Sequence, residues 1–154
     1  MRARTILFIL ALCFVGVGVC FAADPNMGTW KLNEEKSKIG PGQRKNNTVV
    51  YEAAGDSVKV TIGGTDSDGK PFHNEWTGKY DGKDYPVTGD PSQDTRSLKK
   101  IDSRTLVVTV KKNAKVITSG RIVMSPDGKS RTVTTTQTGP DGKKIRSTAV
   151  YDKT

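Results

Sequence analysis

Residues 104–151 read RTLVVTVKKNAKVITSGRIVMSPDGKSRTVTTTQTGPDGKKIRSTAVY, and this stretch decides the fold class. Runs rich in Val, Ile and Thr are separated by short breaks at Asn113-Ala114, at 125–128 and at 139–142. In the two Pro-Asp-Gly breaks, proline presets φ for the first turn position, and Gly accepts the left-handed conformation that rejoins the next strand. β-Branched runs joined by turns this short predict antiparallel neighbouring strands.

The same pattern extends from residue 104 toward the N-terminus. Turn residues recur at even spacing before residue 104, and no segment has a helical period. The sequence therefore predicts an all-β fold, an antiparallel meander barrel of 8–10 strands. Trp30 and Leu32 share one face of the opening strand, and a loop is expected over 33–47 with a helical turn near 34–37. The further strands are expected at 48–54, 57–63, 71–80, 84–87, 95–101, 104–111, 115–124, 130–138 and 143–151.

Residues 1–22 have the features of a secretory signal peptide. Arg2 and Arg4 form a positive start, residues 6–19 are apolar apart from glycine, and the segment ends in small residues. We expect cleavage after Ala22, with cleavage one residue later or a retained anchor as alternatives. The mature chain, 23–154, is then a single barrel domain in the periplasm or medium, without a transmembrane span. Both cysteines, Cys13 and Cys20, leave with the signal, so no disulfide is expected.

Two short motifs resemble those of calycins, the group of lipocalins and fatty-acid-binding proteins. Gly28-Thr29-Trp30 is similar to the lipocalin opening motif, and the ending 147–153 resembles the terminus of fatty-acid-binding proteins. Where that terminus carries an arginine two places before Tyr151, this chain has Ala149. The resemblance implies a small barrel that holds an apolar molecule.

Aromatic residues are the first candidates for a ligand site. Phe72, Trp76 and Tyr80 fall on one face of one strand and point together to the interior if that face is buried. They either line a cavity or fill the core. Small residues on other inward positions favour a cavity, because Thr132, Thr134, Thr136 and Thr138 share one face and leave space and polar groups there.

Arg121 is the candidate for binding an acidic group, together with Tyr151. A two-residue loop at Asn113-Ala114 opposes Val110 to Ile117 and turns Arg121 inward. A three-residue loop opposes Val110 to Val116 and turns Arg121 outward, with Val116, Thr118, Ile122 and Met124 inside. A one-residue change in register thus reverses every side chain. We favour the second register, because it avoids an unpaired guanidinium in the interior.

Residues for catalysis or metal binding are few. His73 is the only histidine and shares a face with Glu75, Thr77 and Lys79, which predicts a solvated outer face. The segment 66–69 resembles the first half of a calcium loop but lacks the acidic residue that would close it. We therefore expect no enzyme activity, no metal and no cofactor.

Charge differs between the two halves of the mature chain. Residues 23–94 are net acidic and residues 95–154 are strongly basic, within an overall formal charge of +9. Surface solubility and protection of strand edges explain most of this. Nucleic acid is not an expected partner, because no aromatic residues interleave the basic ones.

These features predict non-catalytic binding or carriage of a small apolar or amphipathic ligand. The alternative is an envelope interaction protein with a filled core that binds anionic surfaces or polymers through its basic C-terminal half.

Overall fold

The computed structural model describes residues 24–154, so the predicted signal peptide lies outside the described residues. Within that range the chain forms ten strands, and none of its residues is helical. The strands are β1 Gly28–Lys38, β2 Lys45–Ala54, β3 Ser57–Thr65, β4 Pro71–Gly78, β5 Tyr85–Thr88, β6 Thr95–Lys100, β7 Thr105–Lys112, β8 Lys115–Met124, β9 Ser130–Thr138 and β10 Lys144–Lys153.

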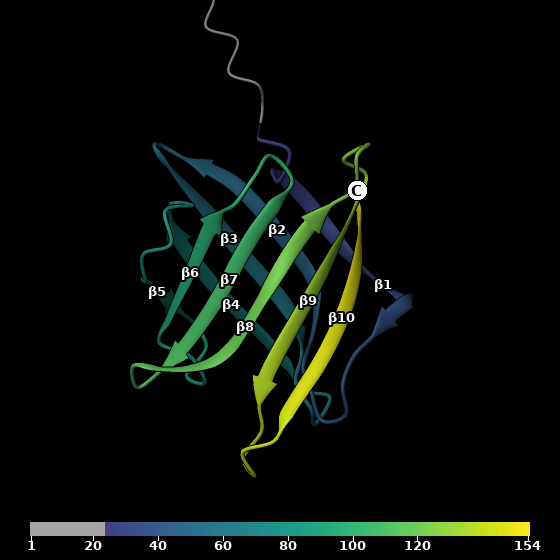
Figure 1. The fold of residues 1–154 in the computed structure, drawn as a ribbon, viewed down its shortest axis with the longest axis vertical. Coiled ribbons are helices and arrows are strands. Elements are labelled where there is room, and N and C mark those ends of the chain that lie inside the picture. The colour runs from purple at the N-terminus through teal and green to yellow at the C-terminus, as the bar shows by residue number, and fades with distance from the viewer. Residues whose placement is uncertain (1–23) are drawn as a thin grey trace, which may run out of the picture.

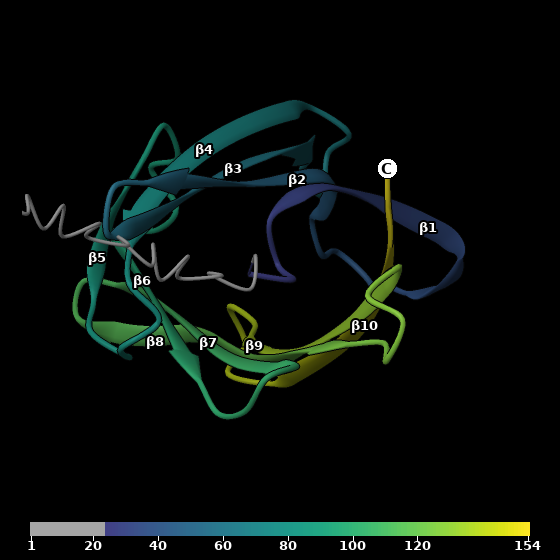
Figure 2. The same ribbon diagram turned by 90° about the horizontal axis from the view of Figure 1, so that it is seen from above.

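The ten strands form a closed antiparallel barrel. Each strand pairs with the next in sequence, and β1 pairs with β10 to close the ring (Figures 1 and 2). Closure removes the free edges that an open sheet would expose. The predicted fold class is therefore confirmed, and the meander order is consistent with a calycin-like barrel.

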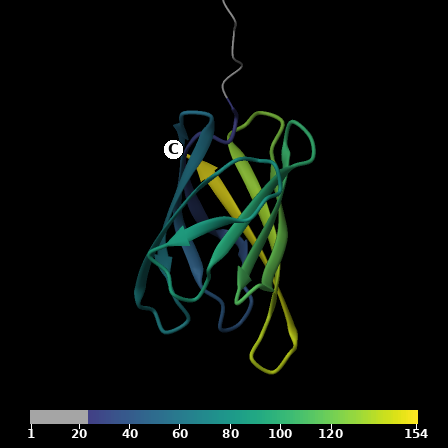
Figure 3. The ribbon, with the colours of Figure 1, turned by 90° about the vertical axis from the view of Figure 1, so that its left-hand side faces the viewer.

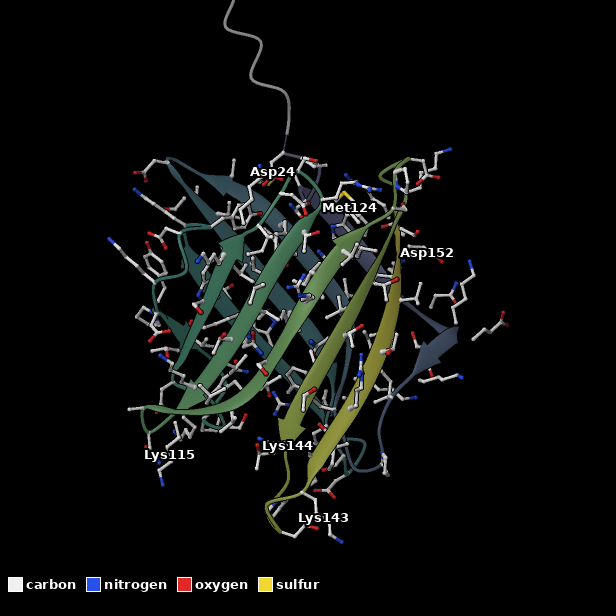
Figure 4. The ribbon with its side chains drawn as sticks, viewed as in Figure 1. Asp24, Lys115, Met124, Lys143, Lys144 and Asp152 are labelled. Atoms are coloured by element: carbon white, nitrogen blue, oxygen red, sulfur yellow. The ribbon has the colours of Figure 1, made fainter. Side chains whose placement is uncertain are left out.

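The barrel has two ends, which we name after one residue at each (Figure 3). The Trp30 end holds the start of β1, the β2–β3 and β8–β9 turns and the C-terminus. The Arg44 end holds the β1–β2, β3–β4, β5–β6, β7–β8 and β9–β10 connections. Figure 4 labels Asp24, Met124 and Asp152 at the Trp30 end, and Lys115, Lys143 and Lys144 at the Arg44 end.

The core follows the alternation of the strands. Val58, Val60 and Ile62 of β3 are buried, whereas the residues between them are partly exposed. Burying side chains of this size stabilises the fold by roughly 1.5–3 kcal/mol each before entropy is counted. Trp30 is fully buried, and its indole Nε1 donates to the Asn26 backbone oxygen at 2.8 Å.

The predicted loop over 33–47 is wrong for most of its length. β1 continues to Lys38 and β2 begins at Lys45, with an irregularity in the β1–β10 register between Asn33 and Lys38. The hydroxyl of Ser37 contacts the backbone of β10 here, accepting from the Val150 N–H at 2.8 Å. Residues 34–36 are exposed and polar, so the apolar pattern that marks the other strands is missing.

The prediction for the inward face of β9 is also wrong. Val133 pairs with the buried residues Ile122 and Ala149, so the inner face carries Arg131, Val133, Thr135 and Gln137. Thr132, Thr134, Thr136 and Thr138 therefore face outward. Both faces of this strand are mostly polar, so alternation alone did not distinguish them, and pairing with two apolar neighbours decides the register.

The β7–β8 register combines parts of both alternatives. The turn has two residues, Asn113 and Ala114, with φ of 49° and 60°, and Lys112 pairs with Lys115. A bulge then makes Lys111 face Val116 while Val110 faces Thr118, which leaves Ile117 as the extra residue. Arg121 consequently points outward and Ile122 and Met124 point inward, as the favoured register predicted. Val116, expected inside, is exposed.

Candidate functional site

A cavity of about 260 Å³ lies inside the barrel and reaches the Arg44 end. Its volume is close to the lower bound of about 300 Å³ for typical small-molecule sites. Exposed Ser92 and partly exposed Arg44 are among its lining residues, so the cavity meets solvent at this end. Aliphatic and polar side chains line it in similar numbers, and the aliphatic lining residues are Val49, Val60, Ile62, Leu98, Val108, Val110, Ile117, Ile122 and Val133.

A hydrogen-bond network centred on Asp90 lies at the mouth of the cavity. Asp90 is buried in the β5–β6 connection and accepts from the Arg44 guanidinium and from Gln93 Nε2 at 2.7 Å. Ser92 donates to the same carboxylate from its N–H at 3.0 Å and its hydroxyl at 2.6 Å. Asn74 Nδ2 of β4 adds a longer contact at 3.4 Å. The carboxylate thus joins three separate segments of the barrel.

These contacts keep Asp90 ionised. Burial alone would raise the pKa of this carboxyl, but hydrogen bonds from Ser92, Arg44 and Gln93 outweigh burial and hold the pKa well below its usual value. A carboxylate so fully occupied by donors is unsuited to accept a proton near neutral pH.

Arg96 of β6 extends the network into the cavity. Its Nη2 donates to Asn74 Oδ1 at 3.1 Å and to Gln93 Oε1 at 2.9 Å. Its Nη1 has no hydrogen-bond partner among the described residues, and only 5% of the residue is exposed. Burial lowers the pKa of Arg96 to about 10, so the guanidinium still carries its charge at neutral pH.

Arg131 of β9 lines the cavity among aromatic rings. Its guanidinium carbon lies 4.6 Å from the centroid of Trp30, 4.7 Å from that of Tyr51 and 5.3 Å from that of Tyr151. Stacking of a cation on ring faces stabilises it without hydrogen bonds. Burial raises the pKa of Tyr151 to about 12, so this phenol stays neutral.

The three aromatic residues predicted to line a site point inward but lie outside the cavity. Trp76 is buried, with its Nε1 donating to the Arg96 backbone oxygen at 2.7 Å and its ring packed edge-on against Tyr85. Phe72 and Tyr80 are partly buried against the core. None of these three residues contributes to the cavity wall. They fill space within the barrel and do not line a cavity, and the sequence had left both roles open.

The predicted pair of Arg121 and Tyr151 is not brought together. Tyr151 is buried and lines the cavity, whereas Arg121 is exposed on the outer face of β8, opposite Val107. His73 lies on the outer face of β4, with its side chain 60% exposed, as predicted.

The polar residues that do face the cavity were missed from the sequence. Arg96 precedes Leu98 by two positions and Arg131 precedes Val133 by two, so alternation places both arginines on inner faces. The sequence therefore contains a signal that predicts the inward position of these two arginines. The contacts of Arg44, Asp90 and Gln93 come from loops and carry no such periodic signal.

No group of three or more His, Cys, Asp and Glu side chains within residues 24–154 is arranged to hold a metal ion. Over the same range, no helix is long and apolar enough to cross a membrane.

Comparison with known proteins finds similarity only in solved structures. No protein-family model and no curated protein matches the chain. The structure of EF1p2_mFAP2b bound to DFHBI is 13% identical, covering 86% of this chain and 97% of that one with a TM-score of 0.49. A redesigned β-barrel, mFAP1, bound to DFHBI, is 15% identical, covering 86% and 98%, with a TM-score of 0.46. Likeness at this level carries no inference about what this chain binds.

Proposed function

We propose that this protein binds a small apolar or amphipathic molecule in its interior cavity, without catalysing a reaction. The supporting observation is the cavity itself, whose wall combines aliphatic side chains with polar ones that come from several strands and loops. This combination is typical of small-molecule sites, where apolar walls provide affinity and a few polar groups fix orientation.

The chemistry of the described residues favours binding over catalysis. Asp90 is the buried carboxylate at the cavity mouth, and its lone pairs are engaged by Arg44, Ser92 and Gln93. His73, the one histidine of the chain, points to solvent on the opposite side of the barrel wall. Neither residue is placed to act as a general acid or base inside the cavity.

The alternative role, a filled-core protein acting through its basic half, is less well supported. It requires an interior occupied by side chains, whereas the Arg44 end of this barrel holds a cavity. We retain from the sequence the proposal that the protein is exported to the periplasm or medium. Intact-mass measurement of secreted protein tests this, and a soluble species that retains residues 1–19 would reject it.

Native mass spectrometry of protein purified from its own host tests the proposed function. We expect a bound small molecule on the wild-type protein. Thr135→Trp should abolish this binding, because Thr135 lines the cavity and the new indole would occupy it. Gly120, which pairs with Thr135 on β8, has no side chain to hinder the indole. Thr134→Trp, one residue away on the outer face, should retain it. Wild-type protein free of any ligand, or equal occupancy of the two variants, would contradict the proposal.

A further inference from the structure

We infer that the ligand carries a negatively charged group that pairs with Nη1 of Arg96. This inference rests on the proposed function, because it specifies the chemical class of the molecule in the same cavity. The ligand is then an amphipathic monoanion, with an apolar body and a carboxylate or similar oxyanion.

One nitrogen of the Arg96 guanidinium is buried without a hydrogen-bond partner. Arg96 is 95% removed from solvent, and amide oxygens of Asn74 and Gln93 engage only its Nη2. Nη1 has no partner among the described residues, although Arg96 lines the cavity. A buried N–H donor without an acceptor is unfavourable, so an anion that pairs with Nη1 would supply the missing hydrogen bond.

The charged side chains that line the cavity are all positive. Three arginines line it, Arg44, Arg96 and Arg131, and no lining residue is acidic. Asp90 lies beside the cavity but pairs directly with Arg44. The amides of Asn74 and Gln93 stand between Asp90 and Arg96, so the carboxylate orients the guanidinium through them without neutralising it by contact.

Arg96 and Arg131 differ in what surrounds their guanidinium groups. Three aromatic faces surround the guanidinium of Arg131, which explains how that charge is stabilised in the absence of hydrogen bonds. Among the described residues, no aromatic ring lies over the guanidinium of Arg96, and the amide oxygens of Asn74 and Gln93 fix its orientation. A guanidinium that is already oriented and has an unpaired nitrogen is suited to recognise an anion, whereas the unpaired Nε and Nη1 of Arg131 lie among aromatic rings at the Trp30 end.

Titration calorimetry with octanoate, octan-1-ol and octylamine tests the inference, because these probes share one alkyl chain and differ in the head group. Wild-type protein should bind octanoate about 10- to 100-fold more tightly than octan-1-ol, as expected for one charge-assisted hydrogen bond. Octylamine should bind most weakly. Arg96→Gln should remove the preference for octanoate and leave the affinity for octan-1-ol within about twofold.

Arg121→Gln is the matched control, because it removes the same charge from the outer face of β8. It should keep the wild-type preference. If Arg96→Gln does not fold, Arg96→Met takes its place, because it also removes the charge and keeps a long side chain, and it should lose the preference for octanoate in the same way. Equal binding of octanoate and octan-1-ol by wild-type protein overturns the inference and leaves the proposed function standing.

Two further results would count against it. Equal weakening of the binding of all three probes by Arg96→Gln would show that Arg96 shapes the cavity without recognising charge, and this overturns the inference alone. Binding of none of the three probes, together with ligand-free protein from the host, overturns both the inference and the proposed function.

Discussion

Arg44 and Asp90 lie 46 positions apart in sequence, and their side chains meet at 2.5 Å at the mouth of the cavity. The contact joins the β1–β2 connection to the β5–β6 connection. Nη2 of the same arginine donates to Ser92 at 3.1 Å, and its guanidinium lies 4.3 Å from the ring centroid of Phe72. One arginine thus links three segments around the opening of the barrel.

Asp90→Asn should therefore destabilise the protein by about 1–3 kcal/mol, because it leaves Arg44 without its charged partner and weakens the contacts of Ser92 and Gln93. Urea unfolding at neutral pH measures the change. Asp84→Asn is the control, because its partner Lys111 lies on the surface and such pairs contribute about 0–1 kcal/mol. An equal loss in the two variants would contradict a special role for Asp90.

The stability of the protein should also depend on Asp90 at acid pH. The pKa of this carboxyl is lower in the folded protein than its usual value, which is about 3.9 in an unfolded chain. Its contribution is fully present above about pH 4 and is lost as the pH falls toward the folded pKa. The difference in unfolding free energy between wild type and Asp90→Asn should therefore shrink from pH 7 to pH 2. A difference that stays constant would show that the carboxylate charge is not what stabilises the network.

Gly128 and Gly142 have φ of 69° and 78°, as the Pro-Asp-Gly turns predict. A Cβ at either position would meet no atom within 4 Å, so substitution tests backbone strain alone. Gly128→Val and Gly142→Val should each cost about 1–2 kcal/mol. Gly63→Ala is the control, because it also has open space but no positive φ, and it should be neutral or slightly stabilising. Unchanged unfolding midpoints in both valine variants would mean that the hairpin turns are wrongly assigned.

Ala114 lies in the β7–β8 turn with φ of 60°, a conformation that costs a residue with a Cβ about 1–2 kcal/mol. Ala114→Gly creates Asn-Gly, the preferred sequence for a two-residue hairpin turn. We expect the unfolding free energy to rise by up to about 1 kcal/mol, since the greater freedom of glycine in the unfolded chain offsets part of the relief. A loss of stability in thermal unfolding would argue against the two-residue turn.

The strands were predictable because their signals are local. Turn residues at Gly128 and Gly142 and alternating residues such as Leu106 and Val108 require no knowledge of the rest of the chain. β1 beyond Asn33 was missed because its residues are polar and exposed, and it is held by contacts to β10 that lie more than 100 positions away.

The site was less predictable, because it depends on single-residue details of register and on loops. A single bulge at Ile117 decides that Arg121 faces solvent, and local sequence gives no sign of that bulge. The sequence predicted a ligand site at large aromatic residues such as Phe72 and Trp76, but these residues pack the interior. The groups around the cavity include Asp90 and Arg44, whose pairing depends on how two distant loops approach each other.

A methyl NMR titration with octanoate tests most directly whether a small amphipathic molecule enters the cavity. Val108 and Ile122 line the cavity, whereas their neighbours Val107 and Val123 point outward on the same strands. We expect saturable shifts and intermolecular NOEs at the methyl groups of Val108 and Ile122, with little change at Val107 and Val123. Contacts confined to the outward methyl groups, or no saturable change at any of the four, would contradict the account.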